Sequence, residues 1–411
     1  MDEENADPPE ESTPEVIKPP LPKRNFDVIK FEKKAKAITA ILTRLAWLVV
    51  LVIAVFFIYK ELSDDRYSIQ HINVPLSFED AGFSGTVVAN LLSDKMEEII
   101  RILQENKETA QYINSIDRPD IQVDMVGVGM PVRAFIALIG DAFGIHKVKR
   151  ISGDIVLDGD TAIFVLRITG QRAERFKAVI QTSRDIAVRK LIDEGSHAIL
   201  KYTDPWMLGV YYTNVKRDGP SAIKLAKYMM ENKSDDPKIL KAAYADWAFG
   251  LLFEGNIEAA EKKIEEGIRK FPDDSDLYNI WGVVLSEGGK DTEAIEKYRT
   301  SLRLFTGKEM TSKRKDQILV NIGVSHAYQS NYDSSLYYFE QALALKKDDW
   351  LTIFNISNIY LFKGDTANFY EYFRRAFDMG MEPDFVRTDP DLKRALGEKR
   401  VNELIKRFRK D

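Results

Sequence analysis

The chain has 411 residues, enough for two or three domains, and its formal net charge is −5. Its basic residues do not gather into a stripe with interleaved aromatic residues, so the charge pattern indicates no nucleic-acid partner. It contains no cysteine, which excludes disulfides, thiol catalysis and cysteine metal sites.

The first segment, residues 1–36, is polar and has no apolar periodicity. It is acidic at its start and then rich in proline. Such a composition cannot bury enough apolar surface to fold, so we expect a disordered tail. The PPLP run at 19–22 could serve as a polyproline ligand, although a solvated tail is the simpler interpretation.

An apolar run follows at residues 37–60. Residues 45–59 carry no polar side chain except the phenol of Tyr59, and residues 37–42 extend the run toward the N-terminus. A helix over 37–59 would be about 34 Å long at about 1.5 Å per residue, enough to cross a hydrocarbon core of about 30 Å. Arg44 is the one charge within residues 37–59, and it lies near enough to one end to reach the headgroups. The pattern predicts a transmembrane helix; a buried core helix is the alternative.

Basic residues favour the N-terminal side of this run. Those on the run or closely preceding it are Lys30, Lys33, Lys34, Lys36 and Arg44, whereas those closely following it are only Lys60 and Arg66. The positive-inside rule predicts a cytoplasmic N-terminus and an extracytoplasmic bulk. In a bacterium this would be a single-pass inner-membrane protein with most of the chain in the periplasm.

The next region, residues 67–170, predicts a small α/β domain. Strand patterns at 67–74 and 121–126 each precede a helical pattern, at 84–107 and 131–143. Two alternating segments then flank Asp158-Gly159, which is typical of a tight hairpin turn. The predicted order is β-α-β-α-β-β, and we expect a linking helix at 171–202.

A small residue recurs at a nearly fixed step in the C-terminal half. The recurring residues are Ala248, Gly282, Gly323 and Ser357, and an apolar frame returns around each of them. The first and last steps are equal, and the middle step is slightly longer. Its extra residues fall in the polar run 306–317, where a longer loop costs little. Aspartate pairs, such as Asp273/Asp274 and Asp348/Asp349, close repeats and predict caps of the next helix.

This frame resembles the tetratricopeptide repeat (TPR) family, whose unit is a helix–turn–helix of about 34 residues, the same length as the first and last steps. The resemblance implies an α-α superhelix, so the predicted fold class is mainly α. We place the repeats at 203–383, with four clear units from residue 241 and one degenerate unit before it. Residues 384–411 predict a capping helix, with one apolar stripe and a basic opposite face that would close the array.

The middle region carries a second resemblance. The phrases INVPLSFEDAGFSG, VGMPVRAFIALIG and ISGDIVLDGDTAIFVLRITG look like the extracytoplasmic domain of uncharacterised bacterial membrane-anchored TPR proteins. The last two phrases also resemble the small α/β modules that begin secretins and TonB-dependent receptors. Neither resemblance implies any catalytic or ligand residue.

In TPR arrays, fixed positions of each first helix line a concave binding face. The matching positions here include asparagines but no lysine or arginine, so the family's clamp for a C-terminal carboxylate is not implied. We expect a groove for an apolar helix or extended peptide, formed by Asn279, Val283, Val324, Tyr328, Phe354, Asn358 and Phe362. The alternative is that some of these residues, together with Phe249 and Phe253, face the linking helix or the cap.

The sequence shows no complete motif for catalysis, metal binding or cofactor binding. The four histidines form no metal motif, and Gly127-Val128-Gly129 is only half of a dinucleotide loop. We therefore predict no enzyme, no cofactor and no metal. The predicted function is a scaffold that binds a partner protein, or a second copy of the chain, beside the membrane. Two alternatives are a receptor that signals to residues 1–36, and an enzyme with a pocket near Asp124, Arg133, Asp141 and His146.

Overall fold

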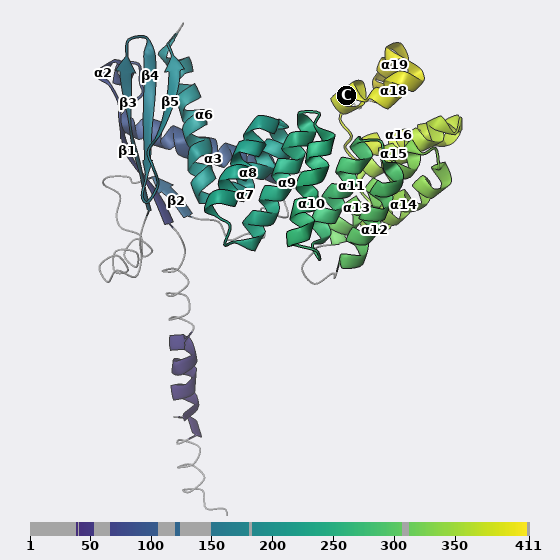
Figure 1. Ribbon diagram of the computed structural model, residues 1–411, viewed down its shortest axis with the longest axis horizontal. Coiled ribbons are helices and arrows are strands. Elements are labelled where there is room, and N and C mark those ends of the chain that lie inside the picture. The colour runs from purple at the N-terminus through teal and green to yellow at the C-terminus, as the bar shows by residue number, and fades with distance from the viewer. Residues whose placement is uncertain are drawn as a thin grey trace, which may run out of the picture. The chain divides into compact units, whose positions relative to one another are not determined.

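The computed structural model describes residues 38–39, 41–52, 66–105, 120–123, 149–180, 183–305 and 312–408 (Figure 1). These residues belong to two compact units, one containing the described residues before 53 and the other containing all those from 66 onward. In the first unit, residues 41–52 are helical. Within the described residues, no helix combines the length and the apolar character that a membrane crossing requires. The remainder of the predicted span lies outside them.

The second unit begins with a five-stranded mixed sheet, whose strand order is β2-β1-β3-β4-β5. The strands are β1 (Arg66–Asn73), β2 (Asp120–Val123), β3 (Lys149–Asp158), β4 (Thr161–Ile168) and β5 (Glu174–Val179). β1 pairs in parallel with β2 and β3, whereas β4 pairs in an antiparallel manner with β3 and β5. The predicted hairpin is confirmed: Asp158 pairs with Thr161, and Gly159 takes the positive φ of 56° that the tight turn needs.

Two helices cover one face of this sheet. α3 (Gly85–Glu105) contacts β1 and β2, α6 (Arg184–Thr203) contacts β4 and β5, and the two helices contact each other. A short helix, α2 (Leu76–Glu79), precedes α3. The linking helix predicted from residue 171 is wrong at its start, because β5 occupies part of that segment and adds an edge strand to β4. The helix begins only after Ser183, whose hydroxyl accepts a hydrogen bond from the Ile186 amide at 3.3 Å. The predicted helix at 131–143 lies outside the described residues.

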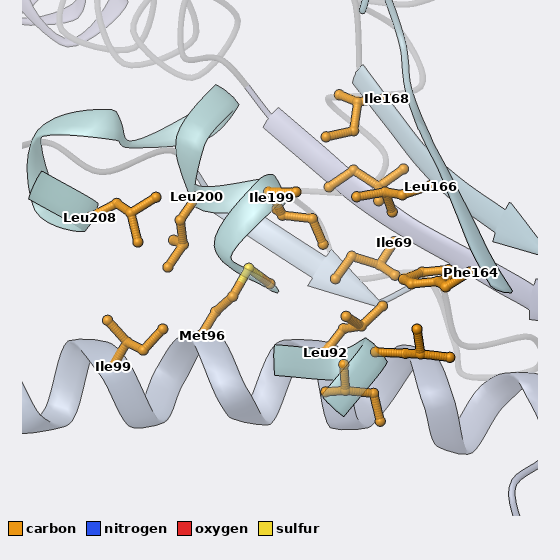
Figure 2. Close-up of a cluster of buried hydrophobic side chains, with 14 of the residues drawn as sticks. Ile69, Leu92, Met96, Ile99, Phe164, Leu166, Ile168, Ile199, Leu200 and Leu208 are labelled. Atoms are coloured by element: carbon orange, nitrogen blue, oxygen red, sulfur yellow. The ribbon is translucent and has the colours of Figure 1, made fainter. Parts of the chain in front are cut away.

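The sheet and the beginning of the helical array share one hydrophobic core. Figure 2 shows side chains of this core, including Phe164 of β4, Leu92 of α3 and Leu208 of α7 (Pro205–Val210). The same cluster continues to Met229 of α8 (Gly219–Asn232) and to Ala243 of α9 (Pro237–Phe253). Between α7 and α8, residues Tyr211–Lys216 form one turn of π-helix. α6 is therefore packed into a core that extends on both sides of it and does not act as a free linker.

The array continues as pairs of helices joined by short turns. Its helices are α9, α10 (Ile257–Lys270), α11 (Ser275–Glu287), α12 (Asp291–Leu304), α13 (Ser312–Tyr328), α14 (Tyr332–Leu345), α15 (Trp350–Phe362) and α16 (Thr366–Asp378). Each odd-numbered helix packs on the helix that follows it, and consecutive odd-numbered helices also contact one another. The array therefore has a TPR-type fold. The predicted aspartate caps are confirmed at Asp274, which accepts from the Leu277 amide at 3.0 Å, and at Asp349, which accepts from the Thr352 amide at 3.1 Å.

The recurring small residues allow close approach of the two helices within a pair. A Cβ atom on Gly282 would lie 2.4 Å from the ring of Tyr298, and one on Gly323 would lie 2.6 Å from the ring of Phe339. Both rings are buried. In these two pairs, an aromatic ring on the second helix thus packs directly on the backbone of the first helix, which is the contact that the sequence period predicts.

The C-terminal end differs from the single capping helix predicted there. It consists of α17 (Pro383–Thr388), α18 (Pro390–Leu396) and α19 (Glu398–Phe408). Gly397 breaks the predicted helix because its backbone has φ 76° and ψ 153°, a non-helical conformation that is open almost only to glycine. The predicted apolar stripe is buried nevertheless, since Leu392, Val401 and Ile405 pack with residues of α15 and α16. We call α17, α18 and α19 the C-terminal cap.

Candidate polypeptide-binding face

The first helices of the four pairs form one continuous surface. We use the name inner face for one surface of α9, α11, α13 and α15. It is the surface that carries the positions predicted to line the groove. α11 and α13 are held together there by side-chain hydrogen bonds: the Asn321 Nδ2 donates to the Asn279 Oδ1 at 3.1 Å. The hydroxyls of Ser286 and Ser325 also lie 3.3 Å apart across the same pair of helices. Asn279, one of the predicted groove residues, therefore already uses its amide oxygen within the chain.

The middle of the inner face exposes apolar surface. Val283 of α11 and Val324 of α13 are half-buried, and each packs at the margin of a buried cluster between helices. Tyr328, the last residue of α13, is 63% exposed, although large aromatic side chains bury most of their surface in a packed array. This part of the surface offers an open aromatic ring beside two valines.

The predicted residues on α15 are mostly covered. Phe354 is only 1% exposed, and its ring lies 5.4 Å from that of Phe385 in the C-terminal cap and 6.2 Å from that of Phe373. It faces the cap, which was the alternative left open by its sequence position, and it is not available to a ligand. Asn358 is 8% exposed, and its Oδ1 has no hydrogen-bond partner in the described part of the chain. Phe362 is 42% exposed and stacks on Tyr332 with ring centres 6.3 Å apart.

The opposite end of the inner face is aromatic but partly occupied. The rings of Phe249 and Phe253 stack with centres 6.2 Å apart on α9. The guanidinium of Arg217 lies 5.1 Å from the centre of the Phe253 ring, a cation–π contact made within the chain. Arg217 follows the π-helical turn and has φ 49°.

Four carboxylates act electrostatically on Tyr328. Partial burial raises the pKa of this phenol, and four nearby acids raise it further: Asp391, Glu287, Asp291 and Asp389. They come from the end of α11, the start of α12 and the start of α18, so three separate segments bring negative charge to one ring. Asp391 is paired with Arg394 at 2.6 Å, and Asp291 accepts a hydrogen bond from the Ser286 hydroxyl at 2.7 Å.

The sequence did not reveal three of these acids as part of a site. Asp291, Asp389 and Asp391 stand at or just after helix starts, where an aspartate is usually explained as a cap. Asp389 does cap α18, because its carboxylate accepts from the Leu392 amide at 2.8 Å. Burial and the neighbouring Asp391 nevertheless raise the pKa of Asp389, which indicates that its charge is poorly compensated.

A further acid lies on the inner face at the start of α11. Burial, followed by repulsion from Asp274, raises the pKa of Asp276 to about 7, and the positive charge of Lys241 opposes that rise. Lys241 itself forms an ion pair with Asp274 at 2.7 Å. This end of α11 therefore changes its charge near neutral pH.

A second buried polar group lies away from the inner face, where α6 meets the π-helical turn. The ring of His197 lies 5.7 Å from that of Tyr211 and 5.5 Å from that of Tyr212, both edge to face. Burial lowers the pKa of His197, so the imidazole is neutral at pH 7. These contacts are those of a packed histidine; the same holds for His326, which stacks on Tyr338 at 5.4 Å.

The structure does not test the predicted alternative of an enzyme pocket. The residues named for that pocket lie outside the described residues, and so does the half-motif at 127–129; they are Asp124, Arg133, Asp141 and His146. Among the residues that are described, no three His, Asp or Glu side chains are grouped to hold a metal ion. A shallow hollow of about 480 Å³ opens at one end of the sheet, lined by Val74, Val156, Val165, Asn73, Asp154 and Arg167. Its polar groups are engaged with one another, since Asp154 binds both Asn73 and Arg167.

No family model matches the chain, and no curated protein matches it. Among solved structures, it is similar to the APC/C hetero-tetramer Cut9–Hcn1, with 17% identity over 52% of this chain and 42% of that chain, at a TM-score of 0.34. It is also similar to PilW, described as a widely conserved type IV pilus biogenesis factor, with 15% identity over 49% of this chain and 90% of that one, at a TM-score of 0.39. A third similar structure is PilF of Pseudomonas aeruginosa, with 13% identity over 51% of this chain and 92% of that one, at a TM-score of 0.37. The chain thus spans less than half of the Cut9–Hcn1 chain, and the TPR-type fold rests on the helix pairs described above.

Proposed function

We propose that this chain is a membrane-tethered scaffold whose inner face binds a segment of a partner polypeptide. The observation that carries the proposal is the open apolar surface at the middle of the array. Tyr328 is exposed, and Val283 and Val324 of the same face are half-buried, whereas Phe354 of α15 is covered by the C-terminal cap. A helix or extended peptide would bury these side chains and gain the free energy of removing them from water.

The tether in this proposal is residues 37–60. Its support is the apolar run itself, of which 41–52 are helical, together with the excess of basic residues before it. The partner would then be held on the extracytoplasmic side of the bilayer, which is the periplasm in a bacterium. A second copy of the chain is one partner of this kind.

The shared core supports a scaffold that presents its partner in a fixed orientation. α6 packs on the sheet with one part and on α7 with another, and a single buried cluster extends from β1 to α9. Bending at this junction would expose buried side chains such as Ile199 and Leu208, at a cost of about 1.5–3 kcal/mol for each one fully exposed. We therefore expect the sheet and the first helix pairs to move as one body.

Site-specific photo-crosslinking in native membranes tests the binding face. Tyr328 is replaced by benzoylphenylalanine in the full chain, and Tyr337 is replaced in the same way as the control. Tyr337 is a good match because it is 60% exposed but lies on α14, a second helix, away from the inner face. We expect a defined crosslinked adduct from position 328 and none from position 337. Equal adducts from both positions, or none from 328, would contradict the proposal.

Protease protection tests the tether separately. In sealed, right-side-out vesicles, residues 1–36 should resist an added protease while the array is cleaved. Inverted vesicles should give the opposite result. Release of the intact chain from the membrane by carbonate would show that residues 37–60 do not span it.

A further inference from the structure

The exposed ring of Tyr328 lies in an unusually anionic environment. Glu287, Asp291, Asp389 and Asp391 all lie close enough to act on it electrostatically, and of these Asp391 is paired with Arg394. The side chain of Tyr328 is 63% exposed, so its ring is open to solvent. An aromatic face with carboxylates around it attracts a cation through both its quadrupole and the surrounding charge.

The rest of the inner face adds no positive charge that could compensate. None of the positions that match the concave positions of TPR first helices is lysine or arginine in this chain, whereas Asp276 and Glu287 are both acidic. At the other end of the face, Arg217 already covers the ring of Phe253.

Hydrogen bonds place two of these acids beside the end of α13. The Nε2 of Gln329, the residue after Tyr328, donates to the Oγ1 of Thr292, the residue after Asp291, at 2.9 Å. The hydroxyl of Ser286, the residue before Glu287, donates to Asp291 at 2.7 Å and lies 3.3 Å from the hydroxyl of Ser325 on α13. The end of α11 and the start of α12 are therefore fixed next to the helix turn that carries Tyr328.

We propose that the segment bound on the inner face is cationic, with a lysine or arginine side chain over the ring of Tyr328 and between the carboxylates of Glu287 and Asp291. This inference rests on the proposed function and specifies the chemistry of its ligand. The valines beside the ring take the apolar side chains of the same segment. An acidic segment is rejected, because its charges would meet the carboxylates of α11, α12 and the C-terminal cap at close range.

Binding of three matched peptides to the full chain tests the inference. The peptides are synthetic amphipathic 18-mers with the same leucine face and with lysine, glutamine or glutamate on the polar face. The chain is held in nanodiscs of zwitterionic phosphatidylcholine, and empty nanodiscs give the background. Fluorescence anisotropy measures the dissociation constants in about 20 mM and about 500 mM salt, where the Debye lengths are roughly 20 Å and 4 Å.

We expect the lysine peptide to bind at least about tenfold more tightly than the glutamate peptide in low salt, and the difference to shrink in high salt. Tyr328→Ala should weaken the lysine peptide by about two- to fivefold, as expected for one exposed cation–π contact, and Tyr328→Phe should not. Glu287→Gln should weaken the lysine peptide and strengthen the glutamate peptide. Tyr337→Ala and Glu258→Gln, which alter exposed residues elsewhere on the array, serve as controls and should change neither.

The failures are distinguishable. If the three peptides bind equally and Tyr328→Ala weakens all of them equally, the inner face binds polypeptides but does not select cations, and the inference is wrong. If the lysine peptide is favoured to the same extent in Glu287→Gln and in empty nanodiscs, the preference does not belong to this surface, and the inference is again wrong. If Tyr328→Ala changes no affinity, the proposed binding face itself is refuted.

Discussion

The contact between Gly323 and Phe339 gives a quantitative test of how the repeats are packed. In a Gly323→Ala variant, the new Cβ atom would lie 2.6 Å from Cε1 and 2.7 Å from Cδ1 of the Phe339 ring. Ordinary contacts between such carbons are about 3.5–4.0 Å, so the ring would have to retreat by roughly 1 Å. The ring has little room to do so, because Phe339 is 1% exposed and packs between α13, α14 and α15.

Two opposing effects decide the outcome. Alanine is favoured over glycine inside a helix by about 1 kcal/mol, which would stabilise α13. Overpacking of a filled core costs about 1–3 kcal/mol. The second effect is the larger one here, and we expect a net loss of roughly 1 kcal/mol, confined to the α13–α14 pair and its neighbours because stability in repeat arrays is local.

Hydrogen exchange measured by mass spectrometry on the full chain can detect this change. Amides of α13 and α14 should exchange about fivefold faster in Gly323→Ala, while those of α3 and α6 should be unchanged. The double variant Gly323→Ala with Phe339→Leu, whose smaller side chain leaves room for the methyl group, should recover part of the loss. Slower exchange in the single variant would mean that the ring moves aside freely, and the close contact would not be what sets the period of the repeat.

Three further predictions concern other parts of the chain. Asp276 has a folded pKa of about 7 against an ordinary value of 3.8, so between these values the folded chain keeps a proton that the unfolded chain loses. Urea unfolding should therefore show that the free energy of unfolding falls as the pH rises from 4 to 7, by at most about 1.4 kcal/mol per pH unit. The Asp276→Asn variant should flatten this slope and leave the free energy of unfolding below pH 4 unchanged. Phe354→Ala should cost about 3–5 kcal/mol and speed exchange in the C-terminal cap as well as in α15, whereas exchange limited to α15 would show that the ring does not anchor the cap. Leu208→Ala, in the shared core, should cost about 2–5 kcal/mol and speed exchange in α3 and β4 together with α8; a change restricted to α7 and α8 would argue against one cooperative junction.

The array was predictable because its packing repeats. A ring on the second helix can approach the first helix only where the side chain is small, so Gly282 and Gly323 mark the same contact in successive units. The hairpin between β3 and β4 was predictable for a similarly local reason, since alternation and a turn glycine suffice to specify it. In both cases the information lies within a few dozen adjacent residues.

The errors came where tertiary contacts decide the outcome. Residues 174–179 form an edge strand because they can pair with the free edge of β4. The sequence of this short, charged segment alone does not indicate that such an edge lies beside it. Phe354 occupies a position that faces a ligand in some arrays, but here Phe385 of the C-terminal cap covers it. Which inner-face residues remain open therefore depends on where the cap packs, and sequence position within the repeat does not determine this.

The same cap that covers Phe354 also changes the chemistry of what remains open. It packs on Phe354 through Phe385, and its helix α18 begins with Asp389 and Asp391, whose negative charges raise the pKa of the Tyr328 phenol. The cap thus removes one apolar part of the inner face and adds negative charge to the adjacent part. A change that loosens the cap, such as Phe354→Ala, should then have two separable effects on binding: it should expose apolar surface on α15, and it should weaken the preference for a cationic segment at Tyr328. If loosening the cap strengthened binding of all three peptides in equal proportion, the carboxylates of α18 would have no part in selecting the ligand, and the charge of the site would have to come from Glu287 and Asp291 alone.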